Sequence, residues 1–338
     1  MPRELPGLNP RRLLALMRGA IDRCSLDLSD LAVFTEAASG AYIVTPVLAA
    51  MAGAKHVFAV TQSTRYGSVD EIREKTFELA ALAGVTDRLE VVAEKSAAAL
   101  MQADVVTNSG HVRPIDSHMI ACMKPTAVIP LMYETWELRE GDIDLVACRE
   151  RGVRLTGTNE RHPAVDVFSF LGTMAVKLLL DAGVAVYSSR ILLLCDNPFG
   201  PFIERGLASA HATVERVVPP LVAAQGDTFD AVLVALTPTI HDSLSDDDLK
   251  VIASRWPGAV VAVFWGDVVR ARLAAAGLSC WPTEAPGRGH MGILPSGVGP
   301  EPIVRLQSGS LKAAEALLRY PSNPKHLAHE FGQPFVST

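Results

Sequence analysis

Short runs of almost uninterrupted apolar residues recur along the chain, and longer segments with helical periodicity lie between them. Runs such as HVFAV (56–60) and ILLLC (191–195) have the length of strands and are rich in Val and Leu. A strand of this kind is buried on both faces, as in a parallel sheet that carries helices on each side. The alternation therefore predicts an α/β fold with parallel sheets.

The alternation occurs in two blocks, which indicates two lobes in a chain of 338 residues. Residues 164–181 are apolar on nearly all sides, so we expect one long buried helix between the blocks. We predict two Rossmann-like lobes with parallel sheets and an interlobe cleft. The predicted parts are an N-terminal helical arm (1–30), a first lobe (31–162), a linker helix (163–187), a second lobe (188–300), and a C-terminal return helix and tail (301–338). The polar tail from Pro321 is expected to be loosely attached.

Charge and cysteine content argue against several classes of protein. A net charge of −6 offers no basic face to nucleic acid. The five cysteines are scattered and form no C-x-x-C pair, so we expect no disulfide framework, no metal site and a cytoplasmic location. The N-terminal segment lacks the pattern of a signal peptide, and no apolar run reaches membrane-spanning length, so no membrane association is expected.

The segment RILLLCDNPFG (190–200) stands where a dinucleotide-binding fold would carry its glycine fingerprint. Cys195, Asn197 and Gly200 occupy the three glycine places. The first two glycines normally allow a tight turn and a close approach of the pyrophosphate. Asn tolerates a positive φ, whereas Cys195 adds a Cβ where space is short. The segment therefore supports a dinucleotide-binding fold more strongly than it supports binding of the cofactor.

Several segments resemble the D-2-hydroxyacid dehydrogenase family. The segment from Glu137 to Phe168 is similar to the family's connection between its substrate lobe and its nucleotide lobe. Residues 235–269, with Thr237-Pro238, are similar to the later strands of the nucleotide lobe. ADVVTNSGHVRPID (103–116) is similar to a cleft loop of the family and also to adenosylhomocysteinases. The resemblance implies NAD or NADP as cofactor, a small-molecule substrate and a homodimer.

The resemblance also implies roles for single residues. Glu284 and His290 match the family's glutamate and histidine, of which the carboxylate orients the imidazole while the imidazole exchanges a proton with the substrate hydroxyl. Trp265 stands in place of the catalytic arginine, so another cation or another reaction is needed. Arg113 is the nearest candidate, and His111 beside it is the fourth predicted catalytic residue. The residues predicted to bind the cofactor are Asn197, Pro198, Phe199, Gly200, Thr237, Pro238, Trp265 and Gly266.

The preference between NAD and NADP stays open. No acid closes the strand that runs into VVPPL (217–221), where it would bind the ribose, and Glu215 comes too early. Arg65 in TQSTRYG (61–67) is of a type that holds a 2′-phosphate, but it would place the cofactor on the first lobe. That contradicts the family pattern, and a solvated surface arginine is the favoured interpretation.

Polar turns follow three strands of the first lobe, where open α/β sheets bind ligands. EAASGAY (36–42) offers amides at a helix N-terminus to a carboxylate, NSGHVRP (108–114) is densely polar, and MYETWE (132–137) replaces a glycine-rich family segment. Without a ligand role, the three segments are interpreted in turn as a helix cap, a solvated loop and aromatic packing. The residues predicted to bind substrate are Glu36, Ser39, Gly40, Asn108, Ser109, Gly110, Tyr133 and Glu134.

These features predict an NAD(P)-dependent oxidoreductase of hydroxyacid-dehydrogenase type that acts on a small polar, carboxylate-bearing metabolite in the cleft. Two alternatives stay open: a cofactor-free binding or scaffold protein on the same frame, and a non-redox enzyme such as a transferase. An adenosylmethionine site at EAASG is disfavoured, because the segment has one glycine and no acid closes the next strand.

Overall fold

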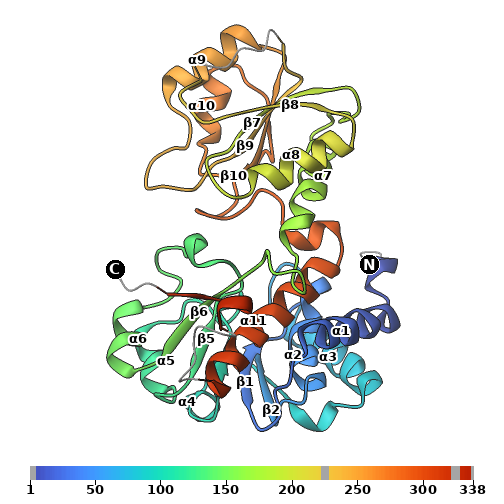
Figure 1. Cartoon of the computed structure of the whole chain (residues 1–338), viewed down its shortest axis with the longest axis vertical. Coiled ribbons are helices and arrows are strands. Elements are labelled where there is room, and N and C mark those ends of the chain that lie inside the picture. The colour runs from blue at the N-terminus through green and yellow to red at the C-terminus, as the bar shows by residue number, and fades with distance from the viewer. Residues whose placement is uncertain (1–4, 222–227, 321–327, 336–338) are drawn as a thin grey trace. The chain divides into compact units, whose positions relative to one another are not determined.

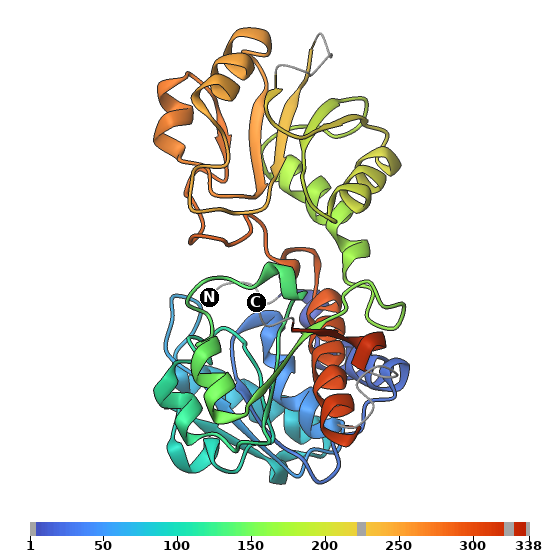
Figure 2. The ribbon, with the colours of Figure 1, turned by 60° about the vertical axis from the view of Figure 1, so that its left-hand side comes forward.

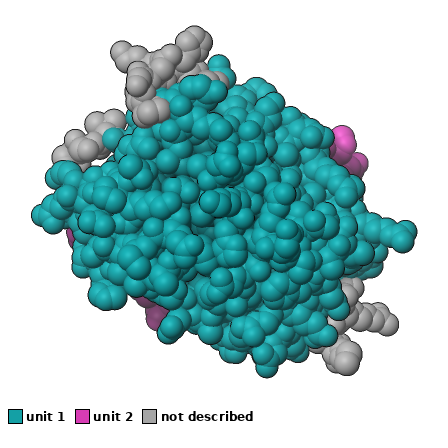
Figure 3. Space-filling view, turned by 90° about the horizontal axis from the view of Figure 1, so that it is seen from below, with its two compact units in different colours: residues 1–167, 299–338 teal, residues 168–298 magenta. Residues whose placement is uncertain are grey.

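The computed structural model describes residues 5–221, 228–320 and 328–335 of the chain (Figure 1). The fold consists of two compact units, coloured separately in Figure 3. Unit 1 contains Met1–Val167 and Gly299–Thr338, so both ends of the chain contribute to it. Unit 2 is the continuous segment Phe168–Val298.

Unit 1 is built on a seven-stranded sheet in the order β12-β6-β5-β4-β1-β2-β3. Neighbouring strands run parallel except for β12, which pairs antiparallel with β6 at the edge. The strands are β1 (Ala32–Glu36), β2 (His56–Val60), β3 (Leu89–Val92), β4 (Val105–Val106), β5 (Val128–Pro130), β6 (Arg154–Thr158) and β12 (Gly332–Pro334).

Helices cover both faces of this sheet, because successive strand residues point to opposite sides. Val33 and Val57 join one buried cluster with α1 (Pro10–Cys24), α2 (Val44–Met51), α3 (Val69–Ala83) and α11 (Glu301–Arg319). Phe34 and Phe58 join the cluster on the other face, with α4 (Ala97–Leu100), α5 (Ser117–Cys122) and α6 (Leu145–Arg151). The short α12 (Ala328–Phe331) leads into β12.

Unit 2 is built on a five-stranded parallel sheet in the order β11-β10-β9-β7-β8 (Figure 2). Its core contains residues of α9 and α10 packed against β7, β9 and β10, while α7 and α8 contact each other closely. The elements are β7 (Arg190–Leu194), β8 (Thr213–Val217), β9 (Ala231–Ala235), β10 (Val260–Trp265), β11 (Cys280–Trp281), α7 (Leu171–Asp181), α8 (Gly200–Ser209), α9 (Asp246–Arg255) and α10 (Arg270–Ala275).

Short 3₁₀ turns complete the described chain. They are η1 (Pro6–Leu8), η2 (Gly40–Ile43), η3 (Thr86–Arg88), η4 (Thr135–Glu137), η5 (Phe168–Phe170) and η7 (Pro295–Val298). Within the described ranges, no helix combines the length and the apolar character needed to cross a membrane.

The predicted fold class is confirmed, and the strands expected at 56–60 and 191–195 are present as β2 and β7, within one residue of their predicted bounds. Two expectations differ from the structure. The helix expected over 164–181 begins only at Leu171, because Asp166 has a left-handed φ of 48° and Phe168–Phe170 form a 3₁₀ turn. The tail is not loose over 328–335, since Gln333 and Pro334 pair with β6, whereas 321–327 and 336–338 lie outside the described residues. The homodimer and the cytoplasmic location stay predictions.

Candidate functional site

Each sheet has a point at which the order of its strands reverses, and ligands of open α/β sheets bind beyond the carboxyl ends of the strands at such a point. In unit 1 it lies between β1 and β4, and in unit 2 it lies between β7 and β9. The order β3-β2-β1-β4-β5-β6 in unit 1 is the strand order of dinucleotide-binding sheets.

Glu36 ends β1 and contacts the turn that follows β4. Its Oε2 accepts a 2.8 Å hydrogen bond from the amide of His111. Glu36 is buried, with only 4% of its surface exposed. A Cβ on Gly110 would lie 3.1 Å from the same oxygen, so glycine permits this close approach. Burial raises the pKa of Glu36, although the His111 amide opposes the shift. The structure thus brings together three predicted residues: Glu36, Gly110 and His111.

The turn after β1 leaves backbone amides free. Ser39 has an extended conformation before η2, and Gly40 has a left-handed φ of +63°. A Cβ built on Gly40 would find no atom within 4 Å, so the space beside this backbone is open. Among the described residues, none accepts a hydrogen bond from the amide of Ser39 or Gly40. These N–H groups stand at the start of the η2–α2 segment, where partial positive charge favours an anion.

Two buried polar atoms lie at the same edge of the sheet. Asn108 follows β4 and is fully buried; its Oδ1 accepts a 2.7 Å bond from the Met132 amide, but its Nδ2 has no partner among the described residues. Thr61 follows β2 and is also fully buried, and within the described chain its Oγ1 lacks a partner too. A buried polar group without a hydrogen bond costs about 1–3 kcal/mol, so a ligand atom or an ordered water is expected at each.

Hydroxyl groups join the ends of β1 and β4. The Thr35 and Thr107 hydroxyls lie 2.8 Å apart, and the Thr107 and Ser109 hydroxyls lie 2.9 Å apart. All three residues are at most 4% exposed, so water competes little with the chain. The hydroxyl chain fixes Ser109 within the polar turn that holds Asn108 and His111.

Arg113 is held by Asp142. The Arg113 Nη1 lies 3.1 Å from Asp142 Oδ2, and the same oxygen accepts a 2.8 Å bond from the Tyr133 hydroxyl and bonds from Arg139. Burial, and then the Asp142 charge, raise the pKa of Tyr133. A catalytic role of Arg113 or a substrate contact of the Tyr133 hydroxyl therefore requires release from Asp142, and both roles stay predictions.

Acidic side chains gather after β5 and β6. Glu134 is fully buried, pairs with Arg161 through two 3.0 Å bonds, and accepts a 2.7 Å bond from the Trp136 indole. Burial raises the pKa of Glu137 to about 8, and the Glu134 charge adds to this shift. Burial also raises the pKa of Glu160 well above its ordinary value, with help from Glu137 and Glu134. Glu137 and Glu160 therefore bind their protons more strongly than ordinary carboxyl groups do, and the substrate role of Glu134 stays a prediction.

Asn197 fills the turn after β7 with its own side chain. Its Oδ1 accepts a 3.1 Å bond from the Phe199 amide and a 3.4 Å bond from the Cys195 thiol, and its Nδ2 donates to the Ala235 carbonyl at 2.8 Å. The Gly200 amide donates to the Asn197 carbonyl at 3.3 Å. The amides that a diphosphate would use are therefore bonded within the turn.

Asp196 places a carboxylate at the switch point of unit 2. Its Oδ1 accepts bonds from the amide and the hydroxyl of Thr237, at 2.8 and 3.0 Å, and so joins the ends of β7 and β9. Such a negative charge opposes a diphosphate at this position. The contact occupies Thr237, one of the predicted cofactor residues, and Pro238 is its neighbour in the chain.

Large side chains pack around the same turn. Phe199 and Trp265 are 1% and 4% exposed, and their ring centroids lie 5.2 Å apart. Cys195 is buried as well, and a Cβ on Gly200 would lie 2.5 Å from Arg216 Nη1. These contacts disfavour a diphosphate beside Pro198 and Phe199, and the cofactor role of 197–200 stays a prediction.

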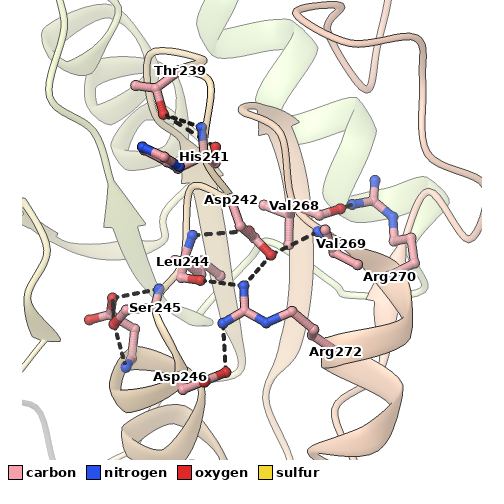
Figure 4. A network of polar contacts seen from close by, with 11 residues as sticks. Thr239, His241, Asp242, Leu244, Ser245, Asp246, Val268, Val269, Arg270 and Arg272 are labelled. Atoms are coloured by element: carbon pink, nitrogen blue, oxygen red, sulfur yellow. Dashed lines mark hydrogen bonds and ion pairs between the residues drawn. The ribbon is translucent and has the colours of Figure 1, made fainter.

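Unit 2 contains a pocket of about 590 Å³ at the carboxyl ends of β9, β10 and β11. Asp242 at its wall accepts bonds from Arg272 and from the Val269 amide, which Figure 4 shows as part of one polar network. Arg270 donates to the Pro282 and Val268 carbonyls, but its buried Nη2 has no acceptor in the described chain. The pocket is lined by Thr239, Ile240, His241, Asp242, Gly266, Asp267, Val268, Val269, Arg270, Thr283, Ala285, Pro286 and Arg288.

The predicted proton-transfer pair lies in the loop after β11. His290 and Glu284 are both exposed, and Glu284 forms no hydrogen bond or ion pair with a described residue. The His290 amide donates to the Gly287 carbonyl at 2.9 Å. Gly289 is anchored on both sides, because its amide donates to Asp267 and its carbonyl accepts from the Trp265 indole. Trp265 thus supports this loop, and the predicted Glu284–His290 contact stays a prediction.

Over the described ranges, no three His, Cys, Asp or Glu side chains form a group suited to a metal ion. Sequence reasoning missed Thr61, Asp142 and Asp196 as parts of these sites. Asp196 directly follows a predicted strand, which was a usable signal, whereas the Asp142–Arg113 contact spans 29 residues and leaves no local pattern.

No protein-family model matches the sequence, and no curated protein matches it. Solved structures do match. A dipicolinate synthase chain from Bacillus subtilis has a TM-score of 0.57 at 12% identity, and the dipicolinate synthase chain from Bacillus halodurans has a TM-score of 0.54 at 12% identity. Each alignment covers 88% of this chain and 100% of the other. A putative D-3-phosphoglycerate dehydrogenase from Ralstonia solanacearum has a TM-score of 0.50 at 13% identity, over 88% of this chain and 98% of that one.

The chain is similar in fold to these dipicolinate synthase chains and to this putative dehydrogenase. The resemblance inferred from sequence segments is therefore confirmed at the level of architecture. Identities of 12–13% show a shared fold and no more, because one fold hosts many activities.

Proposed function

We propose that the protein is a nicotinamide-dependent oxidoreductase that acts on a small polar, carboxylate-bearing metabolite. The observation that carries the proposal is the switch point of unit 1. The strands of this sheet have the order of a dinucleotide-binding sheet. At their carboxyl ends lie the amides of Ser39 and Gly40, which donate no hydrogen bond within the described chain. Thr61 and Asn108 each add a buried polar atom without a partner among the described residues. The residues of unit 1 fit a nucleotide, whereas the turn after β7 satisfies its own donors.

The pocket of unit 2 supports the carboxylate-bearing metabolite. Arg270 has a guanidinium nitrogen without an acceptor within the described chain. The Arg288 side chain is 65% exposed, although its Nε lies 3.7 Å from Oδ2 of Asp267. Guanidinium groups bind carboxylates through paired hydrogen bonds. Thr239 and Thr283 add neutral hydroxyl groups to the same pocket, which suits a small polar molecule.

In this proposal His290 transfers the proton. The nicotinamide, when bound, accepts or donates the hydride. His290 takes the proton of the substrate hydroxyl during oxidation and returns it during reduction, since an imidazole changes its charge near neutral pH. Glu284, in the same loop, orients that imidazole. His111, held by Glu36 through its amide, is the second proton carrier to be tested.

The Asn197–Asp196 turn favours an alternative of another class. Because this turn bonds its own amides and carries a carboxylate, the chain also fits a cofactor-free binding protein or a non-redox transferase on the same frame. The alternative predicts that metabolites bind without any nicotinamide.

The function is tested by binding and turnover on the full chain. Thermal shift and titration calorimetry with NAD, NADP, their reduced forms and adenosylmethionine come first, followed by a panel of 2-hydroxy and 2-oxo acids monitored at the nicotinamide absorbance. Binding of one nicotinamide and its redox turnover with a carboxylate substrate are expected. No binding of either nicotinamide at millimolar concentration overturns the proposal.

A further inference from the structure

The pocket of unit 2 contains a carboxylate whose hydrogen bonding is incomplete. Asp242, on one wall, is occupied, because it accepts bonds from Arg272 and from two backbone amides (Figure 4). Asp267 also lines the pocket, and its Oδ1 accepts a 2.9 Å bond from the Gly289 amide. Its buried Oδ2, in contrast, has no hydrogen-bond partner among the described residues. Such an oxygen costs free energy without a donor, so a donor is expected beside it.

Arg288 gives Asp267 a counter-charge but no hydrogen bond. Its Nε lies 3.7 Å from Asp267 Oδ2, beyond hydrogen-bond distance, and its Nη2 donates to the Thr239 carbonyl at 3.3 Å, which is longer than usual. The Arg288 side chain is largely exposed, and exposed ion pairs contribute little stability. Arg288 can therefore leave Asp267 at little cost, and its departure opens the space beside Oδ2.

A ligand that attracts Arg288 has to replace it at Asp267. The carboxylate of a metabolite draws the guanidinium, because the two groups form paired, charge-assisted hydrogen bonds. Asp267 then loses its close counter-ion, and a partly buried charge without a partner is unfavourable. Arg270 is anchored on the carbonyls of Pro282 and Val268, at 2.9 Å each, so it is not free to take the place of Arg288. A ligand hydroxyl would donate to Oδ2 but leave the charge unbalanced, whereas an ammonium group supplies both the donor and the charge.

We propose that the pocket of unit 2 binds a small amino acid, with its ammonium group on Asp267 and its carboxylate on Arg288. The Arg288–Asp267 pair is thereby exchanged for two ion pairs with the ligand, and the charges balance before and after binding. The proposal rests on the proposed function, which assigns the carboxylate-bearing metabolite to this pocket, and adds that the metabolite carries a primary amine. The volume of about 590 Å³ and the hydroxyls of Thr239 and Thr283 suit a small polar side chain.

Matched probes test the two charged groups of the ligand. The common α-amino acids, the 2-hydroxy acids with the same carbon skeletons and the corresponding amino acid amides are titrated onto the full chain by calorimetry, at up to millimolar concentration. The tightest amino acid is expected to bind at least about tenfold more tightly than its hydroxy acid, which lacks the ammonium, and than its amide, which lacks the carboxylate. The proposal is overturned if no amino acid binds, or if either analogue binds as tightly as the amino acid.

Asp267→Asn tests the ammonium contact, because Asn keeps an oxygen for the Gly289 amide and removes the charge. The amino acid should bind at least about tenfold more weakly. The hydroxy acid should bind at least as tightly as to the native chain, since no charge is left without a counter-ion, and a misfolded variant would instead lose both ligands. Asp247→Asn, at an exposed acid of α9 that pairs with Lys250, is the matched control and should bind as the native chain does. A variant at Asp267 that keeps the preference for the amino acid contradicts the proposal.

Arg288→Ala tests the carboxylate contact. The amino acid and the hydroxy acid should both bind at least about tenfold more weakly, because both carry the carboxylate. Arg205→Ala, at an exposed arginine of α8, is the control and should leave both affinities within about twofold of the native values. Unchanged affinity of the Arg288→Ala protein for the amino acid contradicts the placement of the carboxylate.

The outcomes separate this inference from the proposed function. If an amino acid binds through Asp267 but no nicotinamide supports turnover, the site stands and the function falls. If a nicotinamide supports turnover of a 2-hydroxy acid while no amino acid binds, the function stands and this site falls.

Discussion

The amide of His111 donates a 2.8 Å hydrogen bond to Oε2 of Glu36 and so ties the turn after β4 to the end of β1. This contact crosses the switch point of unit 1, and a Cβ on Gly110 would lie close to the same oxygen. The contact therefore sets how near the two turns approach each other where a ligand is expected.

Glu36→Ala and Glu36→Gln test that contact. Ala leaves the His111 amide without its acceptor, so the free energy of unfolding is expected to fall by about 1–3 kcal/mol. Gln keeps an oxygen at the same place and cannot ionise in this buried position, so the loss is expected to be less than half as large. Urea denaturation of both variants gives the comparison, and equal losses would show that the hydrogen bond contributes little.

The raised pKa of Glu137 predicts that the free energy of unfolding depends on pH. Burial raises its pKa from 4.5 to about 8, so the folded state holds this proton more strongly than the unfolded state does. The contribution of Glu137 is fully present below pH 4.5 and is lost as the pH rises towards 8. Glu137→Gln keeps an acceptor for the Glu134 amide, at 3.1 Å in the native chain, and removes the titration.

The variant should therefore be more stable than the native chain at pH 8 and lose that advantage towards pH 4. Because Glu137 is partly exposed, solvent screens its charge and we expect a gain on the order of 1 kcal/mol. Thermal unfolding across this pH range measures it. A Tm difference that does not change with pH would contradict the assignment.

Gly206 of α8 lies close to Gly172 of α7, so a larger residue there tests how much the packing of these two helices stabilises unit 2. A Cβ on Gly206 would lie 2.3 Å from the Cα of Gly172, so Gly206→Ala forces the two helices apart. We expect the free energy of unfolding of unit 2 to fall by about 1–3 kcal/mol, although alanine favours a helix over glycine by about 1 kcal/mol. Gly258→Ala is the control, because its Cβ would meet no atom within 4 Å. Chemical denaturation measures the free energy of unfolding of both variants. A Gly206→Ala protein as stable as the native chain would contradict the close packing of α7 and α8.

The sequence predicts the sheets better than it predicts the sites. Apolar runs such as HVFAV fix where a strand lies, because burial on both faces excludes polar residues. Ser68 with Glu71, and Gly84, likewise fix the bounds of α3 through local contacts. These signals are local, so one sequence suffices to read them.

Contacts between distant residues leave no such signal. The bond from Met132 to Asn108, the pairing of β12 with β6, and the partners of Asp142 all join segments that a periodicity does not connect. The resemblance directed attention to the turn at 195–200, whereas the strand order of unit 1 appears only in the folded chain. Glu36 and Asn108 were identified as ligand candidates because polar turns followed predicted strands, which is a local signal.

Asp196→Asn tests which turn receives the diphosphate. The variant keeps an oxygen for the Thr237 amide and hydroxyl, which lie 2.8 and 3.0 Å from Asp196 Oδ1 in the native chain, and removes the negative charge. If the diphosphate binds after β7, NADPH should bind at least about threefold more tightly, since repulsion is relieved. With the nucleotide on unit 1, affinity should stay within about twofold, which is the outcome we expect for a charge outside the site. Calorimetry at low salt makes the difference largest.

His290→Ala tests the assignment of proton transfer. Loss of a general acid–base group is expected to lower kcat/KM by about 10²–10⁴-fold, while the Kd for NADPH changes less than about twofold. His118→Ala, at another exposed histidine, is the control and should retain full turnover. If His290→Ala turns over within about threefold of the native chain, His111 becomes the proton carrier to test, because Glu36 already holds its amide at the switch point. A loss of equal size in the His290 and His111 variants would instead indicate two proton transfers, one at each residue, and the pH profile of kcat would then lose one limb in each variant.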